Sequence, residues 1–119
     1  MVSLRDVLLV QLPKRDPKGH EQEGTRPVIV VGLPDTLGKT RFPILVVVPL
    51  TTQIGKWVTV SPKLYPSLEK GQGGLPLRST ALLDQVASLD ATRVLRKIGR
   101  LSTKEFAPIR LGLKSILKL

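Results

Sequence analysis

Hydrophobic residues along the chain gather into short runs that are separated by turn sequences. Two runs consist almost wholly of β-branched residues and leucine, which is typical of strands covered on both faces. Segments rich in proline and glycine, such as "LPKRDPKG", "LPDTLGK" and "EKGQGGLP", punctuate the runs. Short strands at this close spacing favour a small barrel or sandwich. The predicted strands are Val7–Leu12, Val28–Leu33, Ile44–Leu50, Trp57–Val60 and Thr80–Val86, with Arg96–Leu101 as a sixth candidate.

The carboxy-terminal segment has a helical pattern instead. Its apolar positions follow the i, i+4, i+7, i+8 spacing of one helix face, in Ile109, Leu113, Ile116 and Leu117. Ser102 and Glu105 have the spacing of a capping box. Pro108 lacks an N–H and clashes with the preceding turn. We therefore expect a first turn near Thr103, a kink or fresh start, and a helix over Pro108–Leu117.

Length and composition indicate a single globular domain over residues 1–119. Hydrophobic residues make up 41% and charged residues 24%, which is ordinary for a folded protein. The absence of cysteine and the presence of one histidine exclude disulfides, a cysteine nucleophile and a multi-histidine zinc site. We expect neither a cofactor nor a metal. The apolar runs have strand length, so we expect no membrane span, no signal peptide and a cytoplasmic location.

The formal net charge of the chain is +10, and this charge is unevenly placed along the sequence. The segment Ala91–Leu119 has eight basic residues and one acidic residue. Within it, Arg110, Lys114 and Lys118 repeat every fourth position, as a stripe along the predicted helix. A polyanion such as nucleic acid, or an acidic protein tail, is the natural partner of such a surface. The alternative is a solvated basic face with no partner.

Three blocks of the chain, "GHEQEGTRPVIVV", "ILVVVPLTTQI" and "STALLDQVASLDATRVLRKIGRLS", resemble the MazF/PemK (Kid-like) toxins of bacterial toxin–antitoxin systems. The resemblance covers nearly the whole chain. It implies a mainly β fold, a compact SH3-like β-barrel with a carboxy-terminal α-helix, usually as a homodimer. It also implies sequence-specific, metal-independent cleavage of single-stranded RNA, chiefly mRNA, which inhibits translation and growth. The products would be a 2′,3′-cyclic phosphate and a 5′-hydroxyl, and the protein partner an acidic antitoxin.

The resemblance also assigns roles to particular residues. Arg26 matches the arginine of the family's active site, and Thr51 matches its threonine. His20 and Glu21 match loop residues near the scissile phosphate or the RNA, and Asp84 matches an acid that acts as base in some members. Further positions expected to contact RNA are Gln22, Thr52, Gln53, Lys56 and Trp57.

The chemistry limits these roles without settling them. Arginine stays protonated in proteins, and its planar fork fits phosphate oxygens. Arg26 is therefore better suited to stabilising a phosphorane than to acting as a free base. His20, Glu21 and Asp84 all remain candidates for the proton transfer. Asp84 could instead tether a turn, since structural networks also contain acids.

Other readings remain open for two residues. Thr51 taken alone would more often bond the backbone at a strand end. Trp57 is either a core residue or the platform on which a base stacks.

Two positions depart from the family pattern. Some members have an arginine two residues before the acid, proposed as a general acid, but here that position is Leu82. The first strand of the family often opens with glycine before the acidic residue, but here Arg5 precedes Asp6. We expect only a local change where the chain enters that strand.

Two other functional classes compete with the ribonuclease. A toxin of the same fold could act without catalysis, by binding a target such as DNA gyrase. The presence of Arg26 and Thr51 favours the enzyme, because a binding toxin needs neither. A plain SH3-like RNA-binding domain is the third class, but aromatic residues make up only 3% of this chain, whereas strand binders usually stack bases on several.

Overall fold

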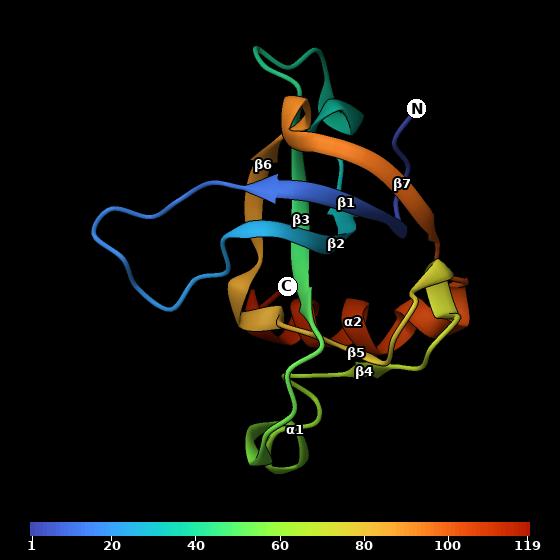
Figure 1. The fold of residues 1–119 in the computed structure, drawn as a ribbon. Helices are drawn as coiled ribbons and strands as arrows, with labels where there is room; N and C mark the ends of the chain where they lie inside the picture. The colour runs from blue at the N-terminus through green and yellow to red at the C-terminus, as the bar shows by residue number, and fades with distance from the viewer.

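Seven antiparallel strands form one sheet that curls into a half-barrel, and a long helix packs against it (Figure 1). The computed structural model describes all residues from 1 to 119. Short 3-10 turns and a one-turn helix, α1, lie in the connections. The strands and helices are β1 (Asp6–Leu12), β2 (Gly24–Gly32), β3 (Ile44–Thr51), α1 (Lys56–Val60), β4 (Ser67–Leu68), β5 (Ser79–Ala81), β6 (Ala87–Asp90), β7 (Val94–Arg100) and α2 (Thr103–Ile116).

The sheet is organised around β3. Its strand order is β4-β5-β3-β2-β1-β7, and β6 pairs with β3 outside this path. β3 pairs with β2 along one edge, and along the other edge with β6 at its start and β5 at its end. One strand therefore connects both halves of the curled sheet.

Both faces of the sheet are buried, as the β-branched composition of β2 and β3 predicts. In β2, Ile29 belongs to the cluster that the sheet shares with α2. Val28 and Val30 point to the second cluster, on the opposite face, with Leu45 and Leu89. Alternate residues of a strand point to opposite faces, so one apolar run fills both cores.

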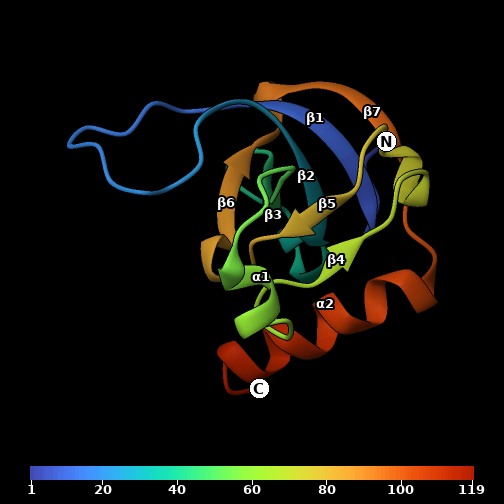
Figure 2. The same ribbon diagram turned by 60° about the horizontal axis from the view of Figure 1, so that its bottom comes forward.

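Helix α2 lies across one side of the sheet (Figure 2). The predicted capping box is confirmed, because the Ser102 hydroxyl accepts the Glu105 N–H and the Glu105 carboxylate accepts the Ser102 N–H. The expected fresh start at Pro108 is wrong: one helix runs from Thr103 to Ile116 with Pro108 in its interior. Proline in a helix interior costs about 3 kcal/mol. Burial of Phe106, Ile109 and Leu113 against the sheet offsets that cost, since each contributes about 2 kcal/mol.

Two predicted strands have different structures. Trp57–Val60 lies in α1, because no strand runs beside it to pair with, and Ser61 N–H instead bonds the Trp57 carbonyl. Thr80–Val86 is divided between the end of β5 and a 3-10 turn over Leu83–Gln85. This turn forms a corner in the chain. Before it, β5 pairs with the last residues of β3, and after it, β6 pairs with the first residues of β3.

The start of β1 is held by charged residues. Arg5 has a φ of 71°, in the left-handed region that favours glycine, which explains why the resembling family often has glycine there. The Arg5 Nη1 donates to the Leu101 carbonyl at 2.8 Å. The Asp6 side chain is fully buried and accepts from Arg100 Nε at 2.8 Å, from Ser3 N–H at 2.8 Å and from Lys97 Nζ at 3.2 Å.

These contacts set the protonation state of Asp6. Burial alone would raise the pKa of this carboxyl, because it disfavours the charged form. The bonds from Arg100, Ser3 and Lys97 together outweigh burial and hold the pKa below its ordinary value. Asp6 is therefore an ionised link between β1 and β7.

Candidate functional site

Arg26 and Thr51 lie at the same end of the sheet, on neighbouring strands. Arg26 is within β2, opposite Val10 of β1. The expectation that the strand begins at Val28 is therefore wrong. Arg26 is part of the paired strand β2, and does not belong to the loop that precedes it. Pairing between β2 and β3 stops at Val28 and Pro49. Continued by two residues, this register would set Arg26 opposite Thr51.

The two side chains differ in exposure. The Arg26 guanidinium is exposed, and only its Nε is engaged, donating to the Glu23 carbonyl at 3.2 Å. The terminal amino groups of Arg26 are thus free to bind an anion. Thr51 is buried, with its hydroxyl oxygen accepting the Gln53 N–H at 3.1 Å. That bond leaves the hydroxyl proton of Thr51 available to another acceptor.

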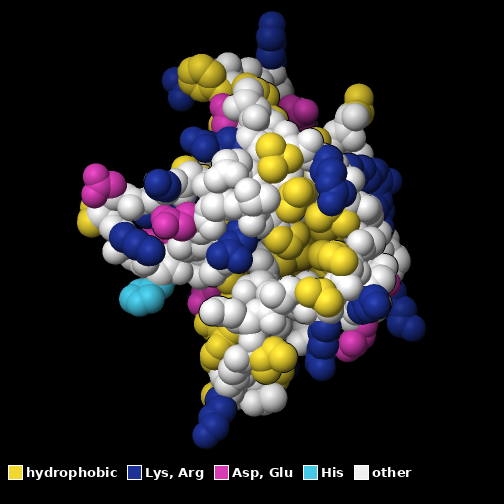
Figure 3. All heavy atoms as spheres, viewed as in Figure 1, with side chains coloured by type: hydrophobic (Ala, Val, Ile, Leu, Met, Phe, Trp, Pro, Cys, Tyr) yellow, Lys and Arg dark blue, Asp and Glu magenta, His cyan; other side chains and the backbone are white.

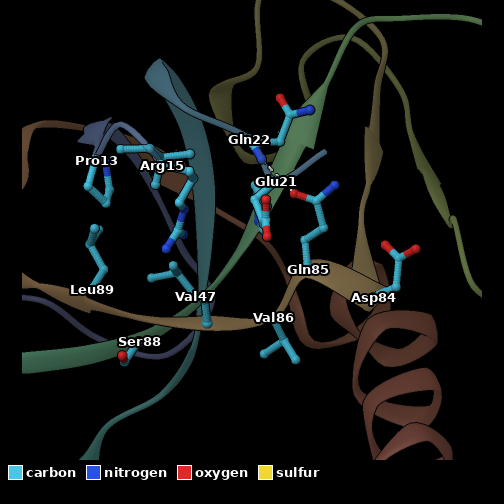
Figure 4. A pocket seen from close by; sticks show the side chains of 13 residues that line it. Pro13, Arg15, Glu21, Gln22, Val47, Asp84, Gln85, Val86, Ser88 and Leu89 are labelled. Atoms are coloured by element: carbon cyan, nitrogen blue, oxygen red, sulfur yellow. Dashed lines mark hydrogen bonds between the residues drawn. The ribbon is translucent and has the colours of Figure 1, made fainter. Parts of the chain in front are cut away.

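A groove of about 280 Å³ opens between the β1–β2 loop and the 3-10 corner (Figure 4). The side chains of Glu21 and Gln22 come from the loop, and those of Asp84 and Gln85 come from the corner. Arg15 also lines this groove, although no motif in the sequence singled it out. The groove thus brings together residues that lie more than sixty positions apart in the chain.

Asp84 is engaged by an aromatic residue. The Tyr65 hydroxyl donates to Asp84 Oδ2 at 2.7 Å, and the hydrogen bond to this carboxylate raises the pKa of Tyr65. Trp57 packs edge-to-face on Tyr65, with ring centroids 4.8 Å apart. Asp84 therefore tethers the corner to the segment that follows α1, and one of its two oxygens is already occupied. Trp57 is half-buried, so part of its ring remains accessible.

His20 lies apart from these groups. Its backbone carbonyl accepts a hydrogen bond from Gln85 Nε2 at 3.3 Å. The imidazole of this residue, the only histidine in the chain, projects from the loop into solvent (Figure 3). The structure therefore brings Glu21, but not the His20 ring, to the groove.

The other RNA-contact candidates lie around α1. Thr52 and Gln53 line a hollow of about 160 Å³ together with Arg78. Thr52 also borders a second groove, of about 360 Å³, with Pro27 and Arg96. Lys56 is exposed at the start of α1. Neither Arg78 nor Arg96 was predicted as a site residue. In a chain with many arginines, the sequence alone does not show which of them will lie beside a groove.

The chain has no group of three His, Asp or Glu residues placed to hold a metal ion. None of its helices is long and apolar enough to cross a membrane.

Comparisons with known proteins identify the family and the fold. Residues 4–117 match the family described as PemK-like, MazF-like toxin of type II toxin–antitoxin system. A curated relative, Endoribonuclease MazF of Staphylococcus saprophyticus, is 30% identical over 92 residues, which cover 77% of this chain and 72% of the relative.

Solved structures have the same fold. The crystal structure of MazF from Deinococcus radiodurans superposes with a TM-score of 0.76 at 21% identity, covering 99% of this chain and 97% of the other. An endoribonuclease in complex with its cognate antitoxin from a mycobacterial species gives a TM-score of 0.70 at 19% identity, with the same coverage of 99% and 97%.

Proposed function

The chain belongs to the PemK-like, MazF-like toxins of type II toxin–antitoxin systems, and we propose that it cleaves single-stranded mRNA at specific sequences without a metal ion. It is an endoribonuclease, like the curated MazF to which it is similar. The single observation that supports this chemistry is the placement of Arg26 and Thr51 at one open end of β2 and β3. Cleavage of mRNA would place the protein in the cytoplasm.

The proposed reaction uses the nucleophile that RNA itself carries. The 2′-oxygen attacks the adjacent phosphorus, a bond from that oxygen to phosphorus forms, and the bond from phosphorus to the 5′-oxygen breaks. The products are a 2′,3′-cyclic phosphate and a 5′-hydroxyl. Negative charge gathers on the phosphoryl oxygens in the transition state, and a pre-positioned guanidinium stabilises it there. Arg26 supplies that group, and the Thr51 hydroxyl donates to the same phosphate.

One base must take the proton of the 2′-hydroxyl, and the leaving 5′-oxygen must receive one. The geometry favours Glu21 among the three candidates left by the sequence. Its carboxylate lines the groove and forms no ion pair. One oxygen of Asp84 accepts from Tyr65, and the His20 ring lies outside the groove.

Incubating the purified protein with a mixed RNA pool in EDTA tests this function. We expect fragments that begin with a 5′-hydroxyl and end in a 2′,3′-cyclic phosphate, with a common sequence at the cut. Ligation-based sequencing of both ends reads the products. Intact RNA would instead favour a toxin of this fold that acts by binding, and inhibition of DNA gyrase is the assay for that alternative.

The protein partner of such a toxin is its antitoxin, and we propose that an acidic tail of this antitoxin covers the RNA surface. Support comes from the formal net charge of +10 and from the exposed side chains of Arg78 and Arg96, which line the two hollows beside Thr52. An acidic antitoxin peptide should displace labelled RNA, and both affinities should fall with added salt, because phosphate contacts release counterions. Simultaneous binding of peptide and RNA without mutual weakening would contradict a shared surface.

We further propose that the toxin is a homodimer. An apolar groove of about 490 Å³ between α2 and the sheet is lined by Val31, Val46 and Leu117. Leu117 is 51% exposed and Leu119 81% exposed beside it, so a second copy would bury apolar surface that one chain leaves open.

Light scattering at micromolar concentration should give about twice the 13.0 kDa mass of one chain. Leu117→Glu should shift the protein towards monomer. Leu37→Glu is the matched control, since Leu37 is 96% exposed and lies outside this groove. A wild-type protein that remains monomeric would overturn the dimer.

A further inference from the structure

The side chain of Gln85 holds the backbone of the β1–β2 loop at two points. Its Oε1 accepts the Gln22 N–H at 2.8 Å, and its Nε2 donates to the His20 carbonyl at 3.3 Å. Figure 4 shows the Gln85 amide beside the loop, at the rim of the groove. Both ends of one amide group are therefore used, and both contacts span more than sixty residues of sequence.

Few other polar contacts tie this loop to the fold. The loop runs from residue 13 to residue 23 and extends away from the sheet (Figure 1). Its other contacts are internal: the Arg15 N–H donates to Glu23 Oε2 at 3.0 Å, and Lys18 lies 3.8 Å from the same carboxylate. The remaining bond, from Arg26 to the Glu23 carbonyl, holds only the end next to β2. Gln85 is thus the polar link that holds the second half of the loop to the rest of the fold.

The corner that carries Gln85 is itself anchored. Leu83 is fully buried in the core shared with α2. Asp84 accepts the Tyr65 hydroxyl at 2.7 Å. A rigid corner next to a long loop is a suitable support for positioning groups that bind a ligand.

We propose that Gln85 is a positioning residue for RNA recognition, which latches His20–Gln22 so that Glu21 and Gln22 face the RNA. This inference rests on the proposed ribonuclease function. Gln22 adds support, because it lines the same groove as Glu21 and its backbone N–H is the group that Gln85 holds.

The latch acts on binding and, through Glu21, on the proton transfer. Arg26 and Thr51 belong to β2 and β3, which the sheet holds whether or not the loop is latched. Loss of the latch should therefore weaken RNA binding and also lower the maximal cleavage rate, but by less than the loss of Arg26. A residue needed only for stability would change neither parameter in a variant that stays folded.

Gln85→Met tests the latch, because it keeps the length and volume of the side chain and removes both hydrogen bonds. Gln72→Met is the matched control: the Gln72 amide accepts the Glu69 N–H at 2.9 Å, a local contact away from the groove. In single-turnover cleavage, Gln85→Met should raise the RNA concentration at half-maximal rate roughly 10-fold, as expected for two hydrogen bonds of modest strength. Its maximal rate should also fall, because Glu21 is no longer held in place, but by less than in Arg26→Ala, and the control should match wild type in both.

Limited trypsin digestion measures the latch without RNA. Lys14, Arg15 and Lys18 are cleavage sites within the loop. Gln85→Met should be cut there several-fold faster than wild type, whereas Gln72→Met should not. Gln85→Glu keeps the acceptor for the Gln22 N–H but loses the donor, so it should fall between wild type and Gln85→Met in loop cleavage.

The outcomes separate the two proposals. Unchanged trypsin cleavage of Gln85→Met would overturn the latch. Faster loop cleavage with an unchanged half-maximal RNA concentration, or a loss in maximal rate alone, would overturn its role in RNA recognition. If wild type itself cut no RNA while the trypsin result held, the ribonuclease function would fail and the latch alone would stand.

Discussion

Replacing Arg26 with alanine should slow RNA cleavage by roughly 10²–10³-fold or more, as the loss of one pre-positioned donor to a charged transition state does. The guanidinium is exposed, and its single hydrogen bond goes to a loop carbonyl, so the fold should tolerate the change. Arg26→Lys should restore only part of the rate, because an ammonium is a point charge and does not match two phosphate oxygens. RNA binding should be largely kept.

Single-turnover cleavage in EDTA measures this effect, with a thermal melt to check folding. Thr51→Ala should also slow cleavage, since it removes a hydroxyl whose proton is available to the phosphate. Arg41→Ala is the matched control, because Arg41 is an exposed arginine that precedes β3 at the end far from Thr51. A folded Arg26→Ala that cuts at the wild-type rate would show that Arg26 is a surface residue without a catalytic role.

Replacing Asp6 with alanine should lower the free energy of unfolding by about 3 kcal/mol at pH 7, the lower end of what breaking a buried ion pair costs. The lower end applies because Arg100 and Lys97 are 43% and 47% exposed and regain water when their partner is lost. Asp6→Asn should cost less, since an amide oxygen can still accept the Ser3 N–H. Urea unfolding measures these differences.

The effect of Asp6 should depend on pH in one direction. Its pKa is lowered in the folded protein, so on acidification the unfolded chain takes up this proton first. The advantage of wild type over Asp6→Ala should be full above about pH 4 and shrink as the pH falls through the lowered pKa. Asp35→Ala, at an exposed aspartate, is the control. A wild-type advantage that stayed constant down to pH 2 would contradict an ionised Asp6.

The parts of the fold that could be predicted from the sequence are those set by neighbouring residues. β2 and β3 are runs of β-branched residues that fill both cores by alternation, and the capping box at Ser102 spans one turn. The predictions for Trp57–Val60 and Thr80–Val86 failed because a strand needs a partner strand beside it. Whether either segment has such a partner depends on where β3 runs, and β3 lies elsewhere in the chain.

Some residues of the candidate site could likewise be predicted from the sequence, and others could not. Arg26 and Thr51 could be predicted because motif blocks carry residue identity, and the register of two strands then brings them to one end of the sheet. The role of Gln85 could not be predicted, although the residue stands in a distinctive block. Its function depends on a loop more than sixty residues away, and the bond from Tyr65 to Asp84 is equally invisible in the sequence.

The pairing of β1 with β7 has a consequence for how the toxin is made. β1 leaves the ribosome well before its partner strand, because Asp6 pairs with Arg100, which lies 94 residues further along the chain. The helix that covers Val7 and Ile29 comes later still. Contacts so distant in sequence form late and fold slowly. A nascent chain stopped before β7 therefore leaves β1 unpaired along one side and one core uncovered, so β7 and α2 must both be translated before a protein that attacks messages can take its folded form.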